Sequence, residues 1–190
     1  MPIILRTTLL LLAFVTLASC ATAQGAPPPT VVIIVRHADK ATTPADDPPL
    51  TATGVERAQA LATLLMDAKV SVVMHTPTVR TRETARPVAE KFGLTPVVLP
   101  LGPAAVHASA VAEAVRQHPG RTIVVVGHSN TIMRYLAALG GPTRPDLCDH
   151  QYDGIYTLIL DGSSVRLVEA RYGPGNPPQT APCATMPPRP

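Results

Sequence analysis

Two arginines and two histidines of this chain are of the types that bind and attack a phosphate-like anion. Arg36 and His37 directly follow one apolar run, His128 follows a second, and Arg80 lies shortly after a third. A guanidinium group holds two oxygens at once, and neutral imidazole approaches a dianion without charge repulsion. Each residue alone could be a solvated charge or an incidental loop residue, but their joint placement favours a single anion site.

The three apolar runs indicate strands of a parallel sheet. They cover residues 31–35, 70–74 and 123–126, and they are rich in β-branched residues. Uninterrupted apolar strands are typical of sheets with helices on both faces, and such sheets bind ligands beyond the carboxyl ends of their strands. The arginines and histidines at these ends would therefore face one crevice.

Helical patterns alternate with these strands. Helices are expected after Thr51 or Thr53 and over 78–91, 104–117 and 130–139, with a kink or restart at Pro87. The first helix should present the apolar face Val55, Ala58, Leu61, Leu64 and Leu65. A short strand is expected at 97–99, and a hairpin that turns at Asp161–Gly162 should close the sheet's edge. This alternation predicts one three-layer α/β/α domain with a mostly parallel central sheet.

Composition narrows the function classes. The chain has 190 residues, a formal net charge of +3, no Trp and 3% aromatic residues. Its basic residues are scattered instead of forming a stripe with aromatics between them, so nucleic-acid binding is not expected. No His, Asp and Glu cluster in the sequence has the spacing of metal ligands, so we expect neither a metal nor another cofactor.

The N-terminus has the pattern of an export signal. Arg6 precedes an apolar run over 9–18 that is too short to span a bilayer, and Leu17–Cys20 resembles the bacterial lipobox. We therefore expect a lipoprotein-type signal peptide over 1–20, lipid on Cys20, and a location on the periplasmic face of a bacterial membrane. Cleavage after Ala21–Ala23, which would give a soluble periplasmic or secreted protein, stays open.

Proline-rich segments flank the predicted domain. Residues 21–30 form a stiff spacer, 31–172 the domain, and 173–190 a tail without catalytic content. If Cys20 carries lipid, Cys148 and Cys183 remain, an even number in a compartment that permits disulfides. Pairing them would tie the tail to the domain, and two unpaired thiols are the alternative.

Four ordered motifs between residues 31 and 160 resemble the histidine phosphatase superfamily, the phosphoglycerate mutase-like group. They are Arg36-His37-Ala38, Pro49-Leu50-Thr51 with Gly54, Thr76-Pro77 with Arg80 and Thr84, and Gly127-His128-Ser129-Asn130. The short chain looks most like the small branch, which includes bacterial phosphohistidine phosphatases. The resemblance implies that His37 is the phosphorylated nucleophile and that Arg36, Arg80 and His128 complete the phosphate pocket.

The chain departs from the family pattern at two places. Ala38 stands where the family usually has glycine, which is tolerable unless the backbone adopts a positive φ. The stretch between Ala85 and His107 lacks the insertion in which mutases of this group carry their acidic proton donor. Asp39 is the nearest acid in sequence and a candidate donor, although it could instead pair with Lys40 or cap a turn.

Other titratable residues are weaker candidates. They are the acids Glu83 and Asp153 and the histidines His75, His107 and His118. We expect Glu83 to orient Arg80 or to be solvated, His75 to be structural or at the rim, and His107 and His118 to lie at the surface.

The sequence thus predicts an exported, metal-independent phosphatase. It would hydrolyse small phosphomonoesters through a covalent phosphohistidine on His37, and a lipid anchor would attach it to the membrane. The alternative is a module that binds a phosphorylated ligand, or acts as a scaffold, with the family fold and little turnover.

Overall fold

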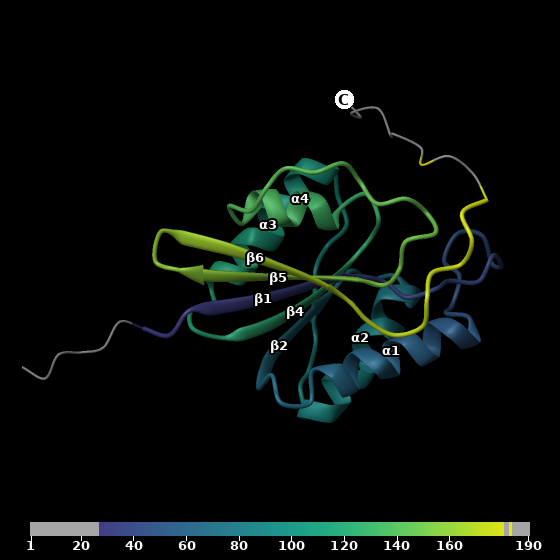
Figure 1. The fold of residues 1–190 in the computed structure, drawn as a ribbon, viewed down its shortest axis with the longest axis horizontal. Helices are drawn as coiled ribbons and strands as arrows, with labels where there is room; N and C mark the ends of the chain where they lie inside the picture. Colours follow the sequence, from purple (N-terminus) through teal and green to yellow (C-terminus); the bar gives the residue numbers. More distant parts are fainter. Residues whose placement is uncertain (1–26, 181–182, 184–190) are drawn as a thin grey trace, which may run out of the picture.

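The computed structural model describes residues 27–180 and Cys183 (Figure 1). The predictions for the signal peptide, for Cys20 and for residues 21–26 of the spacer lie outside these residues. In chain order the elements are β1 (Thr30–Arg36), α1 (Ala52–Leu64), β2 (Val70–His75), α2 (Val79–Phe92), β3 (Val97–Val98), α3 (Ala104–Arg116), β4 (Thr122–Gly127), α4 (Ile132–Ala138), β5 (Gly154–Asp161) and β6 (Ser164–Arg171).

The six strands form one sheet in the order β3-β2-β4-β1-β5-β6. The first four are mutually parallel, whereas β5 and β6 form an antiparallel hairpin at one side. Helices α1 and α2 cover one face of the sheet, and α3 and α4 cover the other (Figure 1). The predicted three-layer α/β/α fold with a mostly parallel sheet is confirmed.

The central strand β1 is buried on both faces. Val32 and Ile34 pack into the core under α3 and α4, whereas Ile33 and Val35 pack into the core under α1 and α2. Side chains of a strand alternate between faces, so a strand covered by helices on both sides must be apolar at every position. This requirement explains the uninterrupted apolar run that the sequence shows.

Strand register brings the reactive segments to one edge. Arg36 pairs with Gly127 in the parallel ladder of β1 and β4, and His75 of β2 pairs with Val126. The chain leaves all three strands at the same level, and the His37 N–H donates to the Gly127 carbonyl at 2.9 Å. The loops that follow these strands therefore meet beyond their carboxyl ends.

Helix α1 begins as expected and buries part of the predicted face. The Thr51 side chain caps it by accepting from the Gly54 N–H at 3.1 Å. Ala58, Leu61 and Leu65 are buried as predicted, but Val55 and Leu64 are each 54% exposed, which corrects the prediction at these two positions. Arg57 on the same helix is fully buried. The packing at Gly54 is so close that an added Cβ would lie 2.2 Å from the Asp39 carbonyl oxygen, so the helix start must carry glycine.

Helix α2 does not restart at Pro87, and the β5–β6 turn lies one residue later than predicted. Pro87 lies inside α2 without ending it, and the helix continues to Phe92 before Gly93, at φ 63°, terminates it. The β5–β6 turn falls on Gly162 and Ser163, one residue later than predicted, because Asp161 still pairs with Ser164. Gly162 has φ 57°, which suits a tight hairpin turn.

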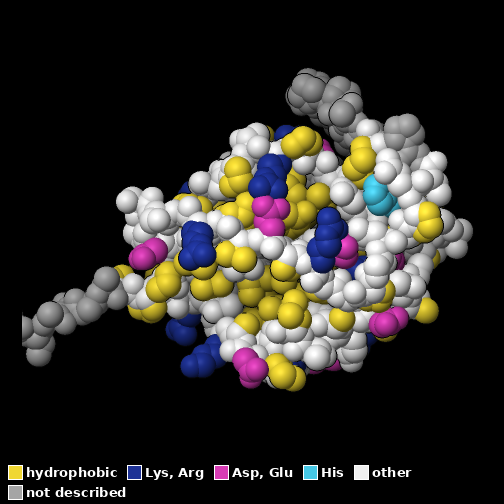
Figure 2. Space-filling model, in the orientation of Figure 1, with side chains coloured by type: hydrophobic (Ala, Val, Ile, Leu, Met, Phe, Trp, Pro, Cys, Tyr) yellow, Lys and Arg dark blue, Asp and Glu magenta, His cyan; other side chains and the backbone are white. Residues whose placement is uncertain are grey.

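Charged side chains on the face in Figure 2 are dispersed, and its lysines and arginines do not gather into one patch. Within residues 27–180 and Cys183, no helix has the length and hydropathy needed to cross a membrane.

Candidate active site

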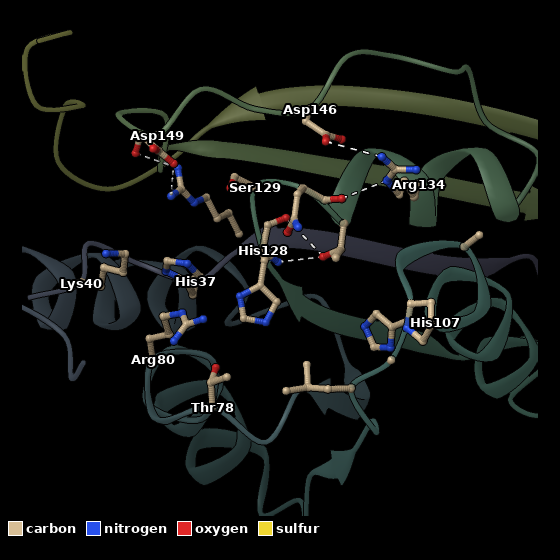
Figure 3. Close-up of a pocket in the computed structure, with 17 residues that line it drawn as sticks. His37, Lys40, Thr78, Arg80, His107, His128, Ser129, Arg134, Asp146 and Asp149 are labelled. Atoms are coloured by element: carbon tan, nitrogen blue, oxygen red, sulfur yellow. Dashed lines mark hydrogen bonds and ion pairs between the residues drawn. The ribbon is translucent and has the colours of Figure 1, made fainter. Parts of the chain in front are cut away.

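A cavity of about 610 Å³ opens beyond the carboxyl ends of β1, β2 and β4. Arg36, His37, Arg80 and His128, the four residues singled out from the sequence, all line it. Figure 3 shows His37, Arg80 and His128 around the same space. The cavity has the size of a small-molecule site, so it can hold a phosphoryl group together with a leaving group.

His37 is oriented as a nucleophile. Its side chain is almost fully buried, and Nδ1 lies 2.8 Å from the Ala38 carbonyl oxygen. A carbonyl only accepts hydrogen bonds, so Nδ1 carries the ring proton and Nε2 keeps its lone pair. Burial, and then the charge of Arg36, holds the pKa of His37 well below its usual 6.5. The ring is therefore neutral at pH 7.

Arg36 is fixed by main-chain carbonyls of a distant loop. Its Nη1 donates to the carbonyls of Cys148, Asp149 and Gln151 at 3.0, 2.9 and 3.0 Å. The guanidinium carbon also lies 4.1 Å from the centre of the Tyr152 ring. The carbonyls neutralise no charge, so the guanidinium stays available to an anion in the cavity.

Arg80 lies in the first turn of α2, where Asp47 holds it. The Asp47 carboxylate accepts from the Val79 N–H at 3.0 and 3.1 Å, and its Oδ1 lies 3.4 Å from Arg80 Nη1. Asp47 thus caps the helix start and orients the arginine, and no sequence motif indicates this role.

Both arginines retain an unused donor. Among the described residues, the Nε–H groups of Arg36 and Arg80 are buried and have no hydrogen-bond partner. A buried donor without a partner is costly, and its occurrence on two arginines of one cavity indicates an acceptor that the protein itself does not supply. Phosphoryl oxygens fit this requirement.

His128 stands beside His37 as a neutral group. The two ring centres are 5.4 Å apart at an interplanar angle of 64°, and Nε2 of His128 lies 2.8 Å from the Thr76 hydroxyl. Burial, and then the charge of Arg80, lowers the pKa of His128 to about 4. A neutral imidazole at this position can donate a hydrogen bond to a bound oxygen without repelling the arginines.

The Ala38 backbone accommodates a side chain. Its φ is not positive, since Lys69 is the one described residue other than glycine with positive φ. The Ala38 N–H donates to Thr84 Oγ1 at 2.9 Å, which fixes the segment next to His37. The expectation that a methyl group is tolerated here is confirmed.

Asp39 is held away from the cavity. Its Oδ2 lies 2.7 Å from Nε of the buried Arg57, and Asp39 is not among the residues that line the cavity. This placement corrects the prediction of Asp39 as proton donor, because its carboxylate accepts from a guanidinium and does not face a leaving group. Asp39 pairs with Arg57 and not with Lys40, the partner expected from the sequence.

Two other acids line the cavity. Asp146 Oδ2 lies 3.7 Å from Arg134 Nη2, and Asp149 Oδ1 lies 3.7 Å from Arg36 Nη2. Neither belongs to a recognisable motif, and both lie in the irregular segment between α4 and β5, so sequence reasoning missed them. Among the described residues, these are the acids that line this space.

The weaker candidates lie elsewhere. Glu83 pairs with Arg82 and Arg86 on the outside of α2, and Asp153 pairs with Arg171. His75 is buried with Nδ1 2.6 Å from the Thr76 carbonyl, which is the structural role expected for it.

His107 differs from expectation. It lines the cavity and is 3% exposed instead of lying at the surface, because its Nε2 contacts the Tyr135 hydroxyl at 2.6 Å. Burial lowers its pKa, and the Pro100 carbonyl opposes this shift. His118 is half-buried near the end of α3 and is not a lining residue.

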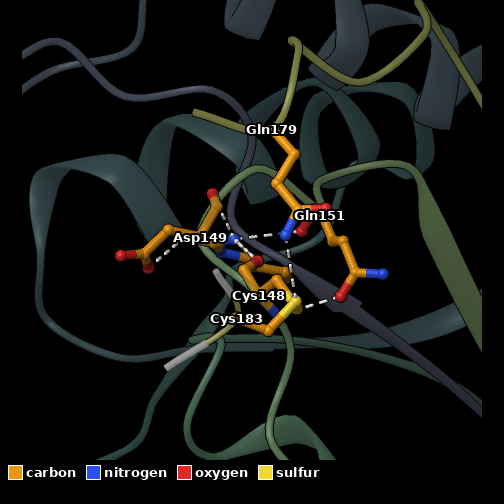
Figure 4. Close-up of a disulfide and its surroundings, with 6 residues drawn as sticks. Cys148, Asp149, Gln151, Gln179 and Cys183 are labelled. Atoms are coloured by element: carbon orange, nitrogen blue, oxygen red, sulfur yellow. Dashed lines mark hydrogen bonds and ion pairs between the residues drawn. A yellow bond between two sulfur atoms is a disulfide. The ribbon is translucent and has the colours of Figure 1, made fainter. Parts of the chain in front are cut away.

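Cys148 and Cys183 form a disulfide (Figure 4). The described part of the tail is also held by Arg57, which donates to the carbonyls of Tyr172, Pro174 and Gly175 at 3.1, 2.6 and 3.3 Å. The tail is therefore attached to the domain near the cavity loops. No group of three or more potential metal ligands occurs among the residues that the structure describes.

The sequence and fold match a known superfamily. Residues 32–101 match the model of the histidine phosphatase superfamily (branch 1), and no curated protein matches the chain. This stretch includes three of the four motifs, so the resemblance to the superfamily is confirmed over residues 32–101, and the match supports a phosphatase.

Several solved structures share the fold of this chain, although their sequences are only distantly similar to it. A structure described as the phosphohistidine phosphatase SixA from Nakamurella multipartitia has 22% identity and a TM-score of 0.55, covering 76% of this chain and 96% of its own. A protein histidine phosphatase SixA complexed with tungstate has 22% identity, TM-score 0.59, and coverage of 74% and 96%. A mycobacterial glucosyl-3-phosphoglycerate phosphatase has 16% identity, TM-score 0.56, and coverage of 77% and 100%.

Proposed function

We propose that this chain, which shares the histidine phosphatase fold and matches that superfamily over residues 32–101, hydrolyses small phosphomonoesters through a phosphohistidine on His37. One observation carries the proposal. A neutral histidine with a free Nε2 shares its cavity with two arginines whose buried Nε–H groups have no partner among the described residues.

In the first step His37 Nε2 attacks the phosphorus atom. The Nε2–P bond forms as the P–O bond to the leaving group breaks, and the bonding electrons leave with the alkoxide oxygen, which takes up a proton. Nδ1 keeps its proton throughout, and the Ala38 carbonyl at 2.8 Å stabilises the positive charge that the phosphorylated ring carries.

In the second step water attacks the phosphohistidine. The O–P bond forms, the N–P bond breaks, and the electrons return to Nε2, which regenerates neutral His37 and releases inorganic phosphate. Arg36, Arg80 and His128 act in both steps, because fixed donors stabilise the charge on the phosphoryl oxygens where it develops. Two guanidinium groups can neutralise this negative charge, and we therefore propose that the reaction needs no metal.

We assign the proton transfer to and from the substrate to Asp149. Asp149 lies 3.7 Å from Arg36, which binds the phosphoryl group, whereas Asp146 pairs with Arg134. A carboxyl group here can protonate the leaving oxygen in the first step and take a proton from water in the second.

The alternative is a phosphate-binding module with little turnover. The full exposure of the Asp149 side chain favours it, because no described contact besides Arg36 fixes a proton donor. A phosphate-release assay with an alkyl phosphate such as glycerol 2-phosphate separates the two, since its leaving alkoxide needs a proton donor. Turnover that His37→Ala abolishes and that a chelator leaves intact supports the phosphatase; phosphate binding without turnover supports the module.

We further propose that the protein is exported and attached to a bacterial membrane through lipid on Cys20. The Leu17–Cys20 motif and the Cys148–Cys183 disulfide support this location, since disulfides persist outside the reducing cytoplasm. Mass analysis of the mature N-terminus in the membrane fraction, with Cys20→Ser as the matched variant, tests it. A mature chain that lacks Cys20 would overturn the anchor.

A further inference from the structure

The carbonyls that hold Arg36 belong to one tight turn. In the 148–151 turn, the Gln151 N–H donates to the Cys148 carbonyl at 3.0 Å, and the Cys148 N–H donates to Gln151 Oε1 at 2.9 Å. Three of the four carbonyls of this turn converge on Arg36 Nη1. The position of the guanidinium therefore depends on the position of the turn.

The turn has little support from regular structure. It lies within residues 141–153, which form neither helix nor strand. Before it, the Leu147 N–H donates to the Ser129 carbonyl at 3.0 Å. After it, the Asn176 side chain accepts from the N–H groups of Tyr152 and Asp153 at 2.8 and 3.1 Å. Both flanks are thus anchored, and the turn spans the interval between them.

The disulfide is the covalent anchor of the turn itself. Cys148 is its first residue, and the bond to Cys183 attaches it to the tail (Figure 4). The tail is in turn fixed to the domain by the carbonyls that accept from Arg57 and by Asn176. The disulfide thus ties the turn that holds Arg36 to a tail that is itself held to the domain at residues 172–176.

We propose that the Cys148–Cys183 disulfide positions Arg36 for the phosphoryl group, so that its reduction weakens phosphate binding. This inference rests on the proposed role of Arg36 in the phosphate site. Cutting the bond leaves the flanks of the turn anchored, so the fold persists. The turn gains conformational freedom, and the buried guanidinium no longer has its three acceptors at fixed places. In the reduced protein the cost of ordering the turn offsets part of the free energy of phosphate binding.

The test measures the dissociation constant of inorganic phosphate by calorimetry on the folded chain, before and after reduction with dithiothreitol. Thiol counting verifies complete reduction, and circular dichroism verifies the native fold. We expect the dissociation constant to rise about tenfold on reduction, the scale of one hydrogen bond to a charged group. Cys183→Ser should show the weaker affinity without reductant and no further response to it.

The variant Arg36→Ala shows whether the disulfide acts by positioning Arg36 or by a general loosening of the loops around the cavity. In this variant reduction should leave phosphate affinity unchanged, because the group through which the disulfide acts is absent. An equal rise in wild type and Arg36→Ala, or no rise in fully reduced, folded wild type, would overturn the inference. Absence of phosphate binding to the oxidised wild type would instead overturn the proposed function, whatever the disulfide does.

Discussion

Arg57 Nε lies 2.7 Å from Asp39 Oδ2, and this buried ion pair joins the segment after the proposed nucleophile His37 to the C-terminal tail. The same guanidinium donates to three carbonyls of residues 172–175. Arg57 is therefore a central support of the loop that follows β1.

Arg57→Ala should lower the free energy of unfolding by about 3 kcal/mol or more, because it leaves the Asp39 carboxylate and three carbonyls without their partner. Urea denaturation measures the change. The matched control is Arg86→Ala, whose side chain is half-exposed and pairs with Glu83 and Glu90, and which should cost less than about 1 kcal/mol. Similar losses from both variants would contradict this role of Arg57.

Asp149→Asn should slow an alkyl phosphate far more than an aryl phosphate. An alkoxide needs a proton to leave, whereas an aryl oxide leaves without one, so removal of the donor should cost about a hundredfold on the alkyl substrate alone. The kcat ratio for the two substrates measures this effect. Asp39→Asn is the control, and it should not change that ratio because Asp39 pairs with Arg57. A ratio that moves with Asp39 and not with Asp149 would reverse the assignment.

Arg80→Ala and His128→Ala should each lower kcat/KM on an aryl phosphate by at least about a hundredfold, the usual loss for one preorganised transition-state donor. Arg82→Ala provides the control, since this neighbour of Arg80 is exposed and pairs with Glu83. Steady-state kinetics on the three variants and the wild type measures these changes in kcat/KM. Wild-type rates in either of the first two would remove that residue from the site.

Stability should fall as the pH falls from about 6.5 towards 4. The pKa of His128 is about 4 in the folded protein, and that of His37 is also lowered. The unfolded chain therefore binds more protons in this window, and the free energy of unfolding decreases as the pH falls. His128→Gln should reduce the loss between pH 7 and pH 5 by about 2 kcal/mol.

Urea denaturation at the two pH values measures this loss, and His118→Gln serves as a control outside the cavity. An unchanged loss in His128→Gln would show that His128 is not buried as a neutral ring.

The sequence predicts the sheet and the four pocket residues for a physical reason. A strand covered on both faces must be apolar throughout, and the ends of parallel strands share one edge, so residues 31–35 and 123–126 indicate where His37 and His128 meet. Arg80 follows from the same argument.

The contacts that fix these residues are not predictable in this way. Arg57 occupies a helix position where charge usually faces solvent, and its burial depends on Asp39 and on tail carbonyls more than a hundred positions away. Arg36 likewise depends on the irregular 148–151 turn. Main-chain acceptors carry no signal in residue type, so neither contact shows in the sequence.

Trapping of the intermediate tests the proposed mechanism itself. The enzyme is mixed with an aryl phosphate that carries an isotopic label in its phosphoryl group. The reaction is quenched in alkali after milliseconds, and the protein is digested for mass spectrometry. We predict one labelled phosphoryl group on Nε2 of His37, stable in alkali and lost in acid, and absent from His37→Ala. Full turnover by His37→Ala, or label on another residue of the wild-type enzyme, would contradict a phosphohistidine at His37.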